Sequence, residues 1–405
     1  MDESKEIIII GGGAAGFMAA ITCAEAAPQH RVTILERGRD TLEKVRISGG
    51  GRCNVTHACF EPRELVKSYP RGAQALLGPF HKFGPGDMVS WCHARGVSLK
   101  TEADGRMFPT TDNSETIVRC LMQAATRAGV RVETSTSVTE LKTRQPTGFE
   151  VVTSHGLRYA DKVMVATGSN QRVWQQLAEL GHRIVTPVPS LFTFVVQDAR
   201  LTGLSGLALP AAEVRIIGSK LVATDNFLVT HRGLSGFAVL KLSAWGARHL
   251  NQCQYRCSVS VNSCPGYSAA EIAESLQEIK YEHAKKQVGA HAQLGLPSRW
   301  WQRLVVAAQI AETMRWADIN HKQLAALATQ ITAATFEVLG KNTHKDEFVT
   351  AGGVDLDEVD FRRFESKLVP NLFLAGEVLD IDALTGGFNF QAAWTGGYLA
   401  GLAMV

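Results

Sequence analysis

The residues that most constrain this chain lie near its start, where an apolar run leads directly into a glycine-rich turn. Ile7–Ile10 are four consecutive isoleucines, which predict a strand covered on both faces in a parallel sheet. Gly11, Gly13 and Gly16 follow with G-x-G-x-x-G spacing, and helical residues continue from Ala14 to about Ala27. In this pattern the first glycine permits a tight turn, the second lets a pyrophosphate approach the backbone, and the third lets the helix pack closely on the strand.

The next segment supplies the other half of a dinucleotide site. The helix that begins at Ala14 and Ala15 would offer free N–H groups and a partial positive charge to the phosphates. A second strand, Arg31–Leu35, ends at Glu36, twenty residues after the last of these glycines. A carboxylate is expected there to bind the ribose hydroxyls. Since Glu36 would repel a 2′-phosphate, we expect Arg37 to lie in solvent or beside the adenine.

Composition and charge exclude several classes of protein. The 405 residues suffice for two or three domains, and the net charge of +3 is too small to argue for nucleic acid as a partner. No run of about 18 apolar residues predicts a membrane helix, and Asp2 and Glu3 argue against a signal peptide. The eight cysteines include no CxxC pair, so we expect reduced thiols in the cytoplasm and no metal site.

A second glycine-rich loop carries polar side chains. Residues 46–56 read R-I-S-G-G-G-R-C-N-V-T, and such a loop exposes backbone N–H groups to a phosphate chain, a ribityl chain or the polar edge of a ring. The alternative is a surface loop without a ligand. Arg52 and Asn54 are also candidates for contact with a substrate, and Cys53, lacking a CxxC partner, is expected to pack near the ligand. The cofactor contacts expected here are Ser48, Gly49, Gly50, Arg52, Cys53 and Asn54.

Three segments describe the domain organisation. A first nucleotide-binding segment covers residues 1–190, and its strand at Lys162–Ala166 ends at Thr167 and Gly168. Pro187 and Pro189 then mark a boundary. An inserted domain covers residues 191–345, with a β-rich part at 191–265 and a helical part at 266–345 whose tryptophans we expect in a core. Residues 346–405 are expected to form the second segment of the nucleotide-binding domain.

The returning segment favours FAD over NAD. A strand at Asn371–Leu374 ends at Gly376 and Glu377, and a helix runs from about Gln391 to the end. Parallel strands bind ligands at their carboxyl ends, and FAD is long enough to need this second site. The helix would direct its positive end at flavin N1 and the C2 carbonyl. The residues expected to contact the cofactor here are Gly376, Glu377, Gly386, Gly387, Phe388 and Asn389.

These motifs together resemble those of a known family. The runs are Gly11–Gly16, Ile47–Thr56, Thr230–Gly236, Ala351–Val354 (read as a glycine turn from Thr350) and Ala375–Ala393. They resemble the YhiN-like (BaiN-like) NAD(P)/FAD-dependent oxidoreductases over nearly the whole chain. The resemblance implies an α/β fold with a discontinuous Rossmann-like FAD-binding domain and an inserted domain. Two departures stand out: Phe237 follows Gly236 where relatives carry proline, and residues 169–172 lack a glycine-containing loop.

The implied chemistry is hydride transfer through flavin N5 between a small organic substrate, such as an enone or amine, and a donor such as NAD(P)H. His231 would act as an acid or bind an anion, the alternative being a hydrogen-bonded loop histidine. No histidine closely precedes the 48–54 loop, so FAD is expected to be non-covalent. A monooxygenase and a non-enzymatic flavin redox sensor remain alternatives. No membrane or nucleic acid is expected as a partner.

Overall fold

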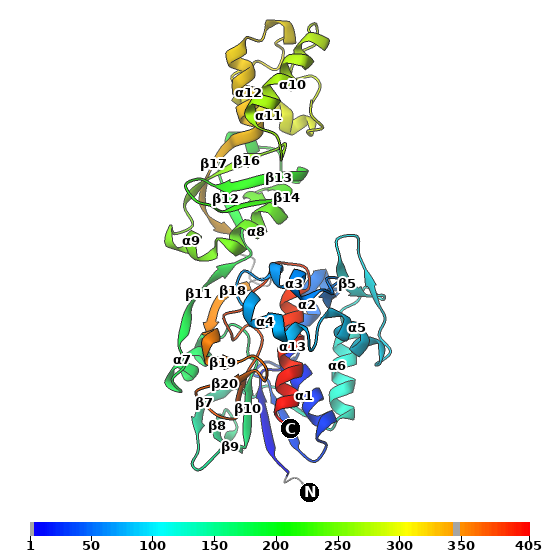
Figure 1. The fold of residues 1–405 in the computed structure, drawn as a ribbon, viewed down its shortest axis with the longest axis vertical. Helices are drawn as coiled ribbons and strands as arrows, with labels where there is room; N and C mark the ends of the chain where they lie inside the picture. The colour runs from blue at the N-terminus through cyan, green and yellow to red at the C-terminus, as the bar shows by residue number, and fades with distance from the viewer. Residues whose placement is uncertain (1–3, 343–348) are drawn as a thin grey trace. The chain divides into compact units, whose positions relative to one another are not determined.

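The computed structural model describes residues 4–342 and 349–405. They form two compact units (Figure 1). The split unit comprises Met1–Val188 and Val349–Val405, and the inserted unit comprises Pro189–Phe348. The predicted boundary after residue 190 lies close to Val188, where the chain passes from the split unit into the inserted unit. The predicted boundary after residue 345 falls outside the described residues.

A mostly parallel sheet forms the core of the split unit. In the described part of the chain it has seven strands, in the order β19-β20-β21-β10-β1-β2-β6. The strands β21, β10, β1, β2 and β6 run parallel, and Ile9 of β1 lies between Met164 and Ile34 of its neighbours. The bounds are β1 (Glu6–Ile10), β2 (Arg31–Leu35), β6 (Arg131–Glu133), β10 (Lys162–Val165), β19 (Val359–Asp360), β20 (Glu365–Ser366) and β21 (Leu372–Leu374).

Two helices from opposite ends of the chain lie side by side in this unit: α1 (Ala14–Ala26) and α13 (Phe388–Ala403). Glycines allow the close approach, since a Cβ on Gly397 would lie 2.4 Å from the Ala15 carbonyl oxygen. The other helices of the unit are α2 (Glu43–Gly51), α3 (Pro62–Leu65), η1 (Val66–Ser68), α4 (Ala73–Phe80), α5 (Pro85–His93), α6 (Glu115–Arg127), α7 (Gln171–Glu179) and η4 (Leu356–Glu358).

Three smaller sheets complete this framework, in the orders β3-β5-β4, β7-β8-β9 and β11-β18. The prediction of a glycine turn at Thr350–Val354 is wrong, because Val349–Val354 forms strand β18. Gly352 and Gly353 are needed there because added Cβ atoms would lie 2.6 Å from Pro187 Cα and 2.5 Å from the Val378 carbonyl oxygen. The other bounds are β3 (Thr56–His57), β4 (Leu99–Thr101), β5 (Arg106–Pro109), β7 (Val138–Thr143), β8 (Phe149–Thr153), β9 (Gly156–Ala160) and β11 (Ile184–Ser190).

The inserted unit is built on a closed barrel with the strand order β12-β15-β14-β13-β16-β17. The bounds are β12 (Thr193–Val196), β13 (Ala208–Ile216), β14 (Val222–Thr230), β15 (Gly233–Ser235), β16 (Cys257–Asn262) and β17 (Ala334–Asn342). The short helices η2 (Ala199–Leu201), α8 (Phe237–Trp245) and α9 (Ala247–Gln252) connect these strands. The predicted helical part therefore ends too late, because β17 returns to the barrel beside β16 and β12.

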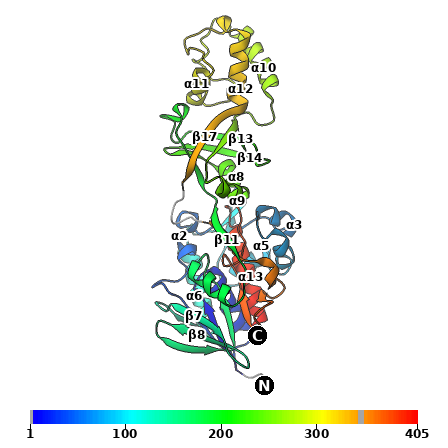
Figure 2. The same cartoon turned by 90° about the vertical axis from the view of Figure 1, so that its left-hand side faces the viewer.

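A helical layer lies at one end of the barrel, as Figure 2 shows. It contains α10 (Ala269–Glu282), α11 (Ser298–Ala307), η3 (Trp316–Asp318) and α12 (His321–Ala333). Trp300, Trp301 and Trp316 are fully buried in the core of the unit, which confirms their predicted role. Two of the indole N–H groups find partners, Trp300 Nε1 at 2.9 Å from Ser263 Oγ and Trp301 Nε1 at 2.8 Å from the Val288 carbonyl.

Candidate functional site

The glycine turn after β1 leaves a space above the start of α1. Gly11 has φ +111°, and a Cβ there would lie 2.4 Å from the Ala166 carbonyl oxygen. A Cβ on Gly16 would lie 2.0 Å from the Gly11 carbonyl oxygen, so these two positions require glycine for packing. A Cβ on Gly13 would meet nothing within 4 Å. Gly13 therefore borders open space at a helix N-terminus.

That N-terminus has no cap of its own. Gly13 is the N-cap residue, no side chain caps the helix, and its first turn holds no acidic residue. Within the described residues, the N–H groups of Ala14 and Ala15 have no backbone acceptor. An uncapped helix start with donors and a partial positive charge is suited to an anion. A pyrophosphate fits this space.

Glu36 is held beside the same turn. Its Oε2 accepts a hydrogen bond from the Gly12 N–H at 2.8 Å, and its Oε1 accepts one from the Gly38 N–H at 2.7 Å. These bonds fix the carboxylate, while each oxygen keeps a further lone pair for a hydroxyl donor. Arg37 next to it is exposed. Glu36 is thus held beside the glycine turn, and its contact with a ribose stays a prediction.

The carboxyl ends of β10 and β21 bring Thr167, Gly168 and Glu377 to this edge, and Lys44 of α2 lies beside them. The Oγ1 of Thr167 is buried and has no hydrogen-bond partner in the described part of the chain. A Cβ on Gly168 would lie 3.8 Å from Glu377 Oε2 and 3.9 Å from Lys44 Nζ, and these two groups form an ion pair at 2.6 Å. Buried hydroxyls normally have partners, so the Thr167 hydroxyl is suited to a bound group. Sequence reasoning missed Lys44, which no motif marks.

The 48–54 loop interrupts α2. Ser48 has ψ 151°, and Gly49 and Gly50 have φ 59° and 68°, which are not helical values. The loop closes through the Cys53 N–H, which donates to the Ser48 carbonyl at 3.0 Å. A Cβ on Gly50 or Gly51 would meet nothing within 4 Å, whereas one on Gly49 would lie 2.8 Å from the Phe108 ring. The loop therefore has an open, side-chain-free face at two of its glycines.

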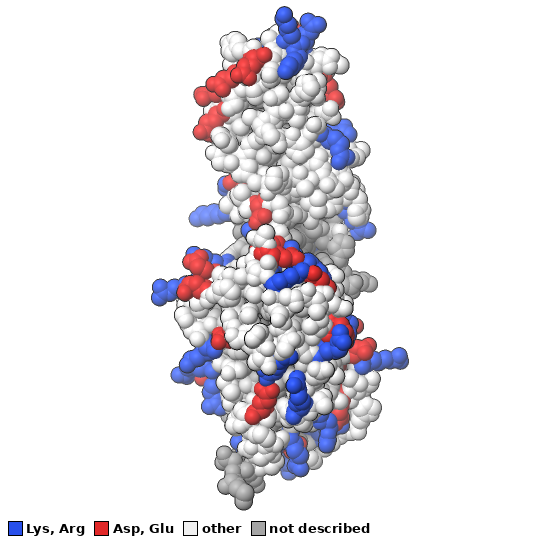
Figure 3. Space-filling view, turned by 90° about the vertical axis from the view of Figure 1, so that its right-hand side faces the viewer, with Lys and Arg blue, Asp and Glu red and all other residues white. Residues whose placement is uncertain are grey.

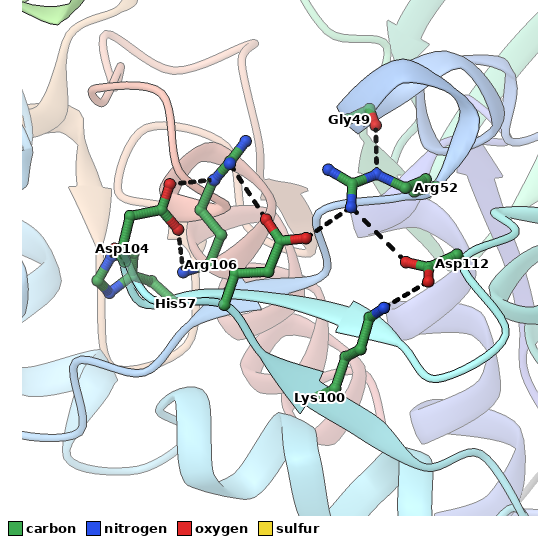
Figure 4. A network of polar contacts seen from close by, with 8 residues as sticks. Gly49, Arg52, His57, Lys100, Asp104, Arg106 and Asp112 are labelled. Carbon is green, nitrogen blue, oxygen red and sulfur yellow. Dashed lines mark hydrogen bonds and ion pairs between the residues drawn. The ribbon is translucent and has the colours of Figure 1, made fainter.

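Arg52 belongs to a network of charged side chains, shown in Figure 4. Its Nη1 donates to Glu102 Oε1 at 2.6 Å, and its guanidinium carbon lies 4.0 Å from the centre of the Phe108 ring. Asp112 lies 3.6 Å from the same nitrogen and also pairs with Lys100. The hydrogen bond to Glu102 raises the pKa of Arg52. Arg52 is thus a fixed cation, and its contact with a ligand stays a prediction.

Asn54 has a structural contact that was not predicted. With its amide oriented to satisfy both neighbours, its oxygen accepts from the Gly387 N–H at 2.9 Å and its nitrogen donates to the Thr56 carbonyl at 3.1 Å. The residue is buried, so it joins the loop to the start of α13. Cys53 is also fully buried, and burial raises the pKa of its thiol to about 12. A direct role for Asn54 in catalysis stays a prediction.

The N-terminus of α13 completes the site in the split unit. Gly387 is its N-cap, with φ 91°, and a Cβ there would lie 2.5 Å from the Thr56 carbonyl oxygen. No acidic residue lies in the first turn. The side chain of Asn389 ties the preceding loop together through Ala383, accepting from its N–H at 2.9 Å and donating to its carbonyl at 3.1 Å. Gly386 precedes this cap with φ 133°.

His57 is a neighbour of this helix start that sequence reasoning missed. Its ring stacks on Phe388 with centroids 4.5 Å apart, and its Nε2 lies 3.1 Å from the Asp104 carbonyl oxygen. A carbonyl only accepts, so Nε2 carries the proton and Nδ1 is an acceptor. Among the described residues Nδ1 is buried without a partner, and burial lowers the pKa of the ring.

His231 lies in the inserted unit, whereas the groups described above belong to the split unit. It occupies the turn between β14 and β15, where it is exposed. It lines a cleft of about 600 Å³ within that unit, together with Thr230, Gly233 and most residues of the segment 196–205. Its predicted role as an acid stays a prediction.

Comparison with known proteins identifies the family. Residues 5–403 match the model of the HI0933-like protein Rossmann domain. The chain belongs to this family. Its relatives include the Ribosomal RNA dihydrouridine synthase of Escherichia coli (strain K12), 28% identical over 404 residues that cover 97% of this chain and 96% of the relative. The 3-dehydro-bile acid delta(4,6)-reductase of Clostridium scindens is 28% identical over 417 residues, covering 98% of each chain.

Solved structures support the fold of this HI0933-like chain. The 3-ketosteroid-delta4-(5alpha)-dehydrogenase from Rhodococcus jostii RHA1 aligns with a TM-score of 0.52 and 12% identity, covering 100% of this chain and 97% of that one. A flavocytochrome c3 fumarate reductase aligns with a TM-score of 0.50 and 16% identity, covering 99% and 78%. The predicted family and Rossmann-like fold are confirmed. So is the class: the chain is an FAD-dependent oxidoreductase.

No helix within residues 4–342 and 349–405 is both long and apolar enough to cross a membrane.

On the face drawn in Figure 3, basic and acidic side chains are interspersed over the split unit.

Proposed function

We propose that this chain reduces a carbon–carbon double bond conjugated to a carbonyl group, with non-covalent FAD as cofactor and NADH or NADPH as donor. Two relatives that match nearly the whole chain support this substrate class. One is named for making dihydrouridine and the other for reducing the 4 and 6 double bonds of a 3-dehydro-bile acid. Uridine and the 3-dehydro steroid differ in shape, but in both the reduced double bond is polarised by a carbonyl.

The observation that carries the proposal is the cradle over Gly13, which is suited to the pyrophosphate of FAD. Open space, two N–H donors of α1 and the buried hydroxyl of Thr167 lie at the carboxyl edge of one sheet. Gly13, Ala14 and Ala15 would hold the pyrophosphate, and Glu36 would hold the adenosine ribose. Non-covalent attachment is proposed because these contacts need no bond between a side chain and the ring.

The second half of the cofactor would lie between the 48–54 loop and α13. When bound there, FAD supplies hydride transfer through its N5. The start of α13, at Gly387 and Phe388, would place a partial positive charge where negative charge develops. Asn54 holds that helix start in place through the Gly387 N–H. Arg52, fixed by Glu102, supplies a positive charge on the same loop.

A polarised double bond needs two things from the chain besides a hydride source. A hydrogen-bond donor or cation must bind the carbonyl oxygen, and an acid must protonate the second carbon. We assign the first role to Arg52, because a guanidinium stays protonated. We assign the second to His231. The expectation that nucleic acid is no partner rested on the net charge of the whole chain, so a uridine in RNA belongs among the substrates to be tested.

The test is an anaerobic spectrum of the purified holoenzyme after addition of NADH or NADPH, followed by a 3-oxo-Δ4 steroid or a uridine-containing RNA. We expect the flavin to be bleached by one nucleotide and reoxidised by one alkene, with a product two hydrogens heavier by mass spectrometry. In a parallel assay to which oxygen is admitted, reoxidation by oxygen with a hydroxylated product would identify a monooxygenase. A flavin that no donor reduces at a useful rate would favour a redox sensor. Either result would refute the proposal.

A further inference from the structure

The cleft beside His231 has a chemical character that alkene reduction does not explain. Its lining includes the hydroxyl-bearing residues Thr202, Ser205 and Thr230, the glycines Gly203 and Gly233, and one acidic residue, Asp198. Its volume of about 600 Å³ falls within the range usual for small-ligand sites, about 300–1,000 Å³. All of these groups belong to the inserted unit.

The one carboxylate of the lining is neutralised within the protein. Both oxygens of Asp198 accept from the guanidinium of Arg200, at 2.9 Å and 2.8 Å. Arg200 also lies over the Phe336 ring at 4.0 Å. The pKa of Asp198 is lowered, chiefly by the hydrogen bond from Arg200. This pair therefore adds no net charge to the cleft.

Three further arginines contact or adjoin residues that line the cleft, and none of them has a carboxylate partner among the described residues. Arg299 Nη1 donates to the Gly203 carbonyl at 3.2 Å, and Arg303 Nη2 donates to the Thr202 carbonyl at 2.9 Å. Arg232, next to His231, donates to Asn342 Oδ1 at 3.2 Å. A guanidinium has about five N–H donors, so each of the three keeps donors for a ligand.

The net charge of the inserted unit agrees with this local excess of positive charge. Residues 189–348 hold sixteen Lys and Arg against twelve Asp and Glu, whereas the remainder of the chain holds 26 against 27. The small positive charge of the whole chain is therefore concentrated in one unit. Such a unit attracts anions, and arginines without carboxylate partners beside a cleft are typical of phosphate recognition.

We propose that this cleft binds the phosphate of a nucleotide, with Arg232, Arg299 and Arg303 as its cationic contacts. Thr202 and Ser205 supply neutral hydroxyl donors, while the Thr230 hydroxyl already donates to the Gly233 carbonyl at 3.2 Å. A guanidinium suits a phosphate because its planar fork donates two parallel hydrogen bonds. The phosphate could belong to a free dinucleotide such as NADPH or to an RNA chain, and the same arginines would serve either. The inference does not depend on which substrate is reduced.

The test measures binding to the FAD-loaded chain by isothermal titration calorimetry, so that the phosphate site over Gly13 is already filled. The probes are inorganic pyrophosphate, NADPH and a 5′-phosphorylated oligouridylate. The variant Arg299→Gln/Arg303→Gln removes two charges but keeps amide donors for the two carbonyls. The control Lys220→Gln removes a charge in the turn between β13 and β14. That turn lies beyond the nine-residue strand β14 from Thr230, a distance of about 30 Å.

We expect at least one probe to bind wild type, and the double variant to weaken that binding by about tenfold or more while the control stays within about twofold. The slope of log K against log salt should also become shallower by about one unit for each arginine that no longer binds a phosphate. Binding of NADPH or of the oligouridylate identifies the source of the phosphate. Arg232→Gln provides a second test if the double variant loses its fold by circular dichroism. No binding to wild type, or equal binding by all variants, would overturn the proposal.

Discussion

Gly13 offers the sharpest test of the cofactor cradle, because adding one methyl group there separates folding from binding. Gly13 has φ −94° and ψ −167°, an extended conformation that alanine adopts freely. The new Cβ would meet nothing within 4 Å. Gly13→Ala should therefore fold, and the added methyl would occupy only the space that we assign to the pyrophosphate.

The magnitudes follow from that geometry. Alanine is a poorer N-cap than glycine by up to about 1 kcal/mol, but it reduces the entropy of the unfolded chain, which offsets about 0.4–1 kcal/mol. The stability without FAD should thus change by less than about 1 kcal/mol. Pushing the pyrophosphate off the backbone should remove at least one charge-assisted hydrogen bond, about 1.5–3 kcal/mol. FAD affinity should therefore fall by about tenfold to a hundredfold.

The assay is a titration of the apoprotein with FAD, followed by flavin fluorescence, together with urea unfolding of the same apoprotein. Gly78→Ala is the matched control, since a Cβ on Gly78 in α4 also meets nothing within 4 Å. That control should bind FAD like wild type. If Gly13→Ala folds and binds FAD with unchanged affinity, the pyrophosphate does not lie over Gly13 and the cradle is assigned incorrectly.

Three further predictions concern stability. Gly397→Ala should lower the free energy of unfolding by about 1–3 kcal/mol, because its Cβ would lie 2.4 Å from the Ala15 carbonyl oxygen and force α1 and α13 apart; urea unfolding measures this, and an unchanged midpoint contradicts it. Arg71→Met should cost about 3–5 kcal/mol, because the side chain of Asp382, which is 0% exposed, loses its guanidinium; adding Asp382→Asn should recover much of the loss in thermal unfolding. Burial raises the pKa of Cys53 from 9.0 to about 12, so the folded chain keeps a proton that the unfolded chain loses. Stability should therefore fall as pH rises from 9 toward 12, by about 1.4 kcal/mol per pH unit from this thiol, and Cys53→Ala should flatten that dependence.

Local patterns predicted the first part of the fold well. The isoleucine run, the glycine turn and the second strand appear as β1, the start of α1 and β2. These elements were predictable because their signals lie within short stretches: continuous apolar residues, glycine spacing and β-branched residues. The short strand β21 before Gly376 was predicted for the same reason.

The prediction that residues 334–342 belong to the helical part is wrong, although the sequence there carries a local signal for a strand. Ala334, Phe336 and Val338 are buried, while Thr335, Glu337 and Leu339 face outward. This is the alternation of a half-buried strand. An alanine-rich helix ends at Ala333, and the helical pattern was extended across the change in period. The spacing of the apolar residues over 334–339 therefore indicates the strand that the structure shows as β17.

Contacts between distant segments could not be predicted in this way. Lys44 pairs with Glu377 across 333 positions, and Asn54 contacts Gly387 at the other end of the chain. Neither pair has a sequence pattern of its own, because each pairing depends on which strands become neighbours. His57 was missed for the same reason: only the fold places its ring against Phe388.

The sheet order explains how a cofactor site divided by an inserted unit is still assembled. Strand β10 pairs in parallel with β1 on one side and with β21 on the other. The turn at Gly11, the hydroxyl of Thr167 and the pair Gly376–Glu377 therefore follow three adjacent strand ends. Because β10 pairs with both β1 and β21, its register fixes the distance between the phosphate half and the C-terminal half of the site. A bulge introduced between Val165 and Thr167 should therefore disturb both halves at once.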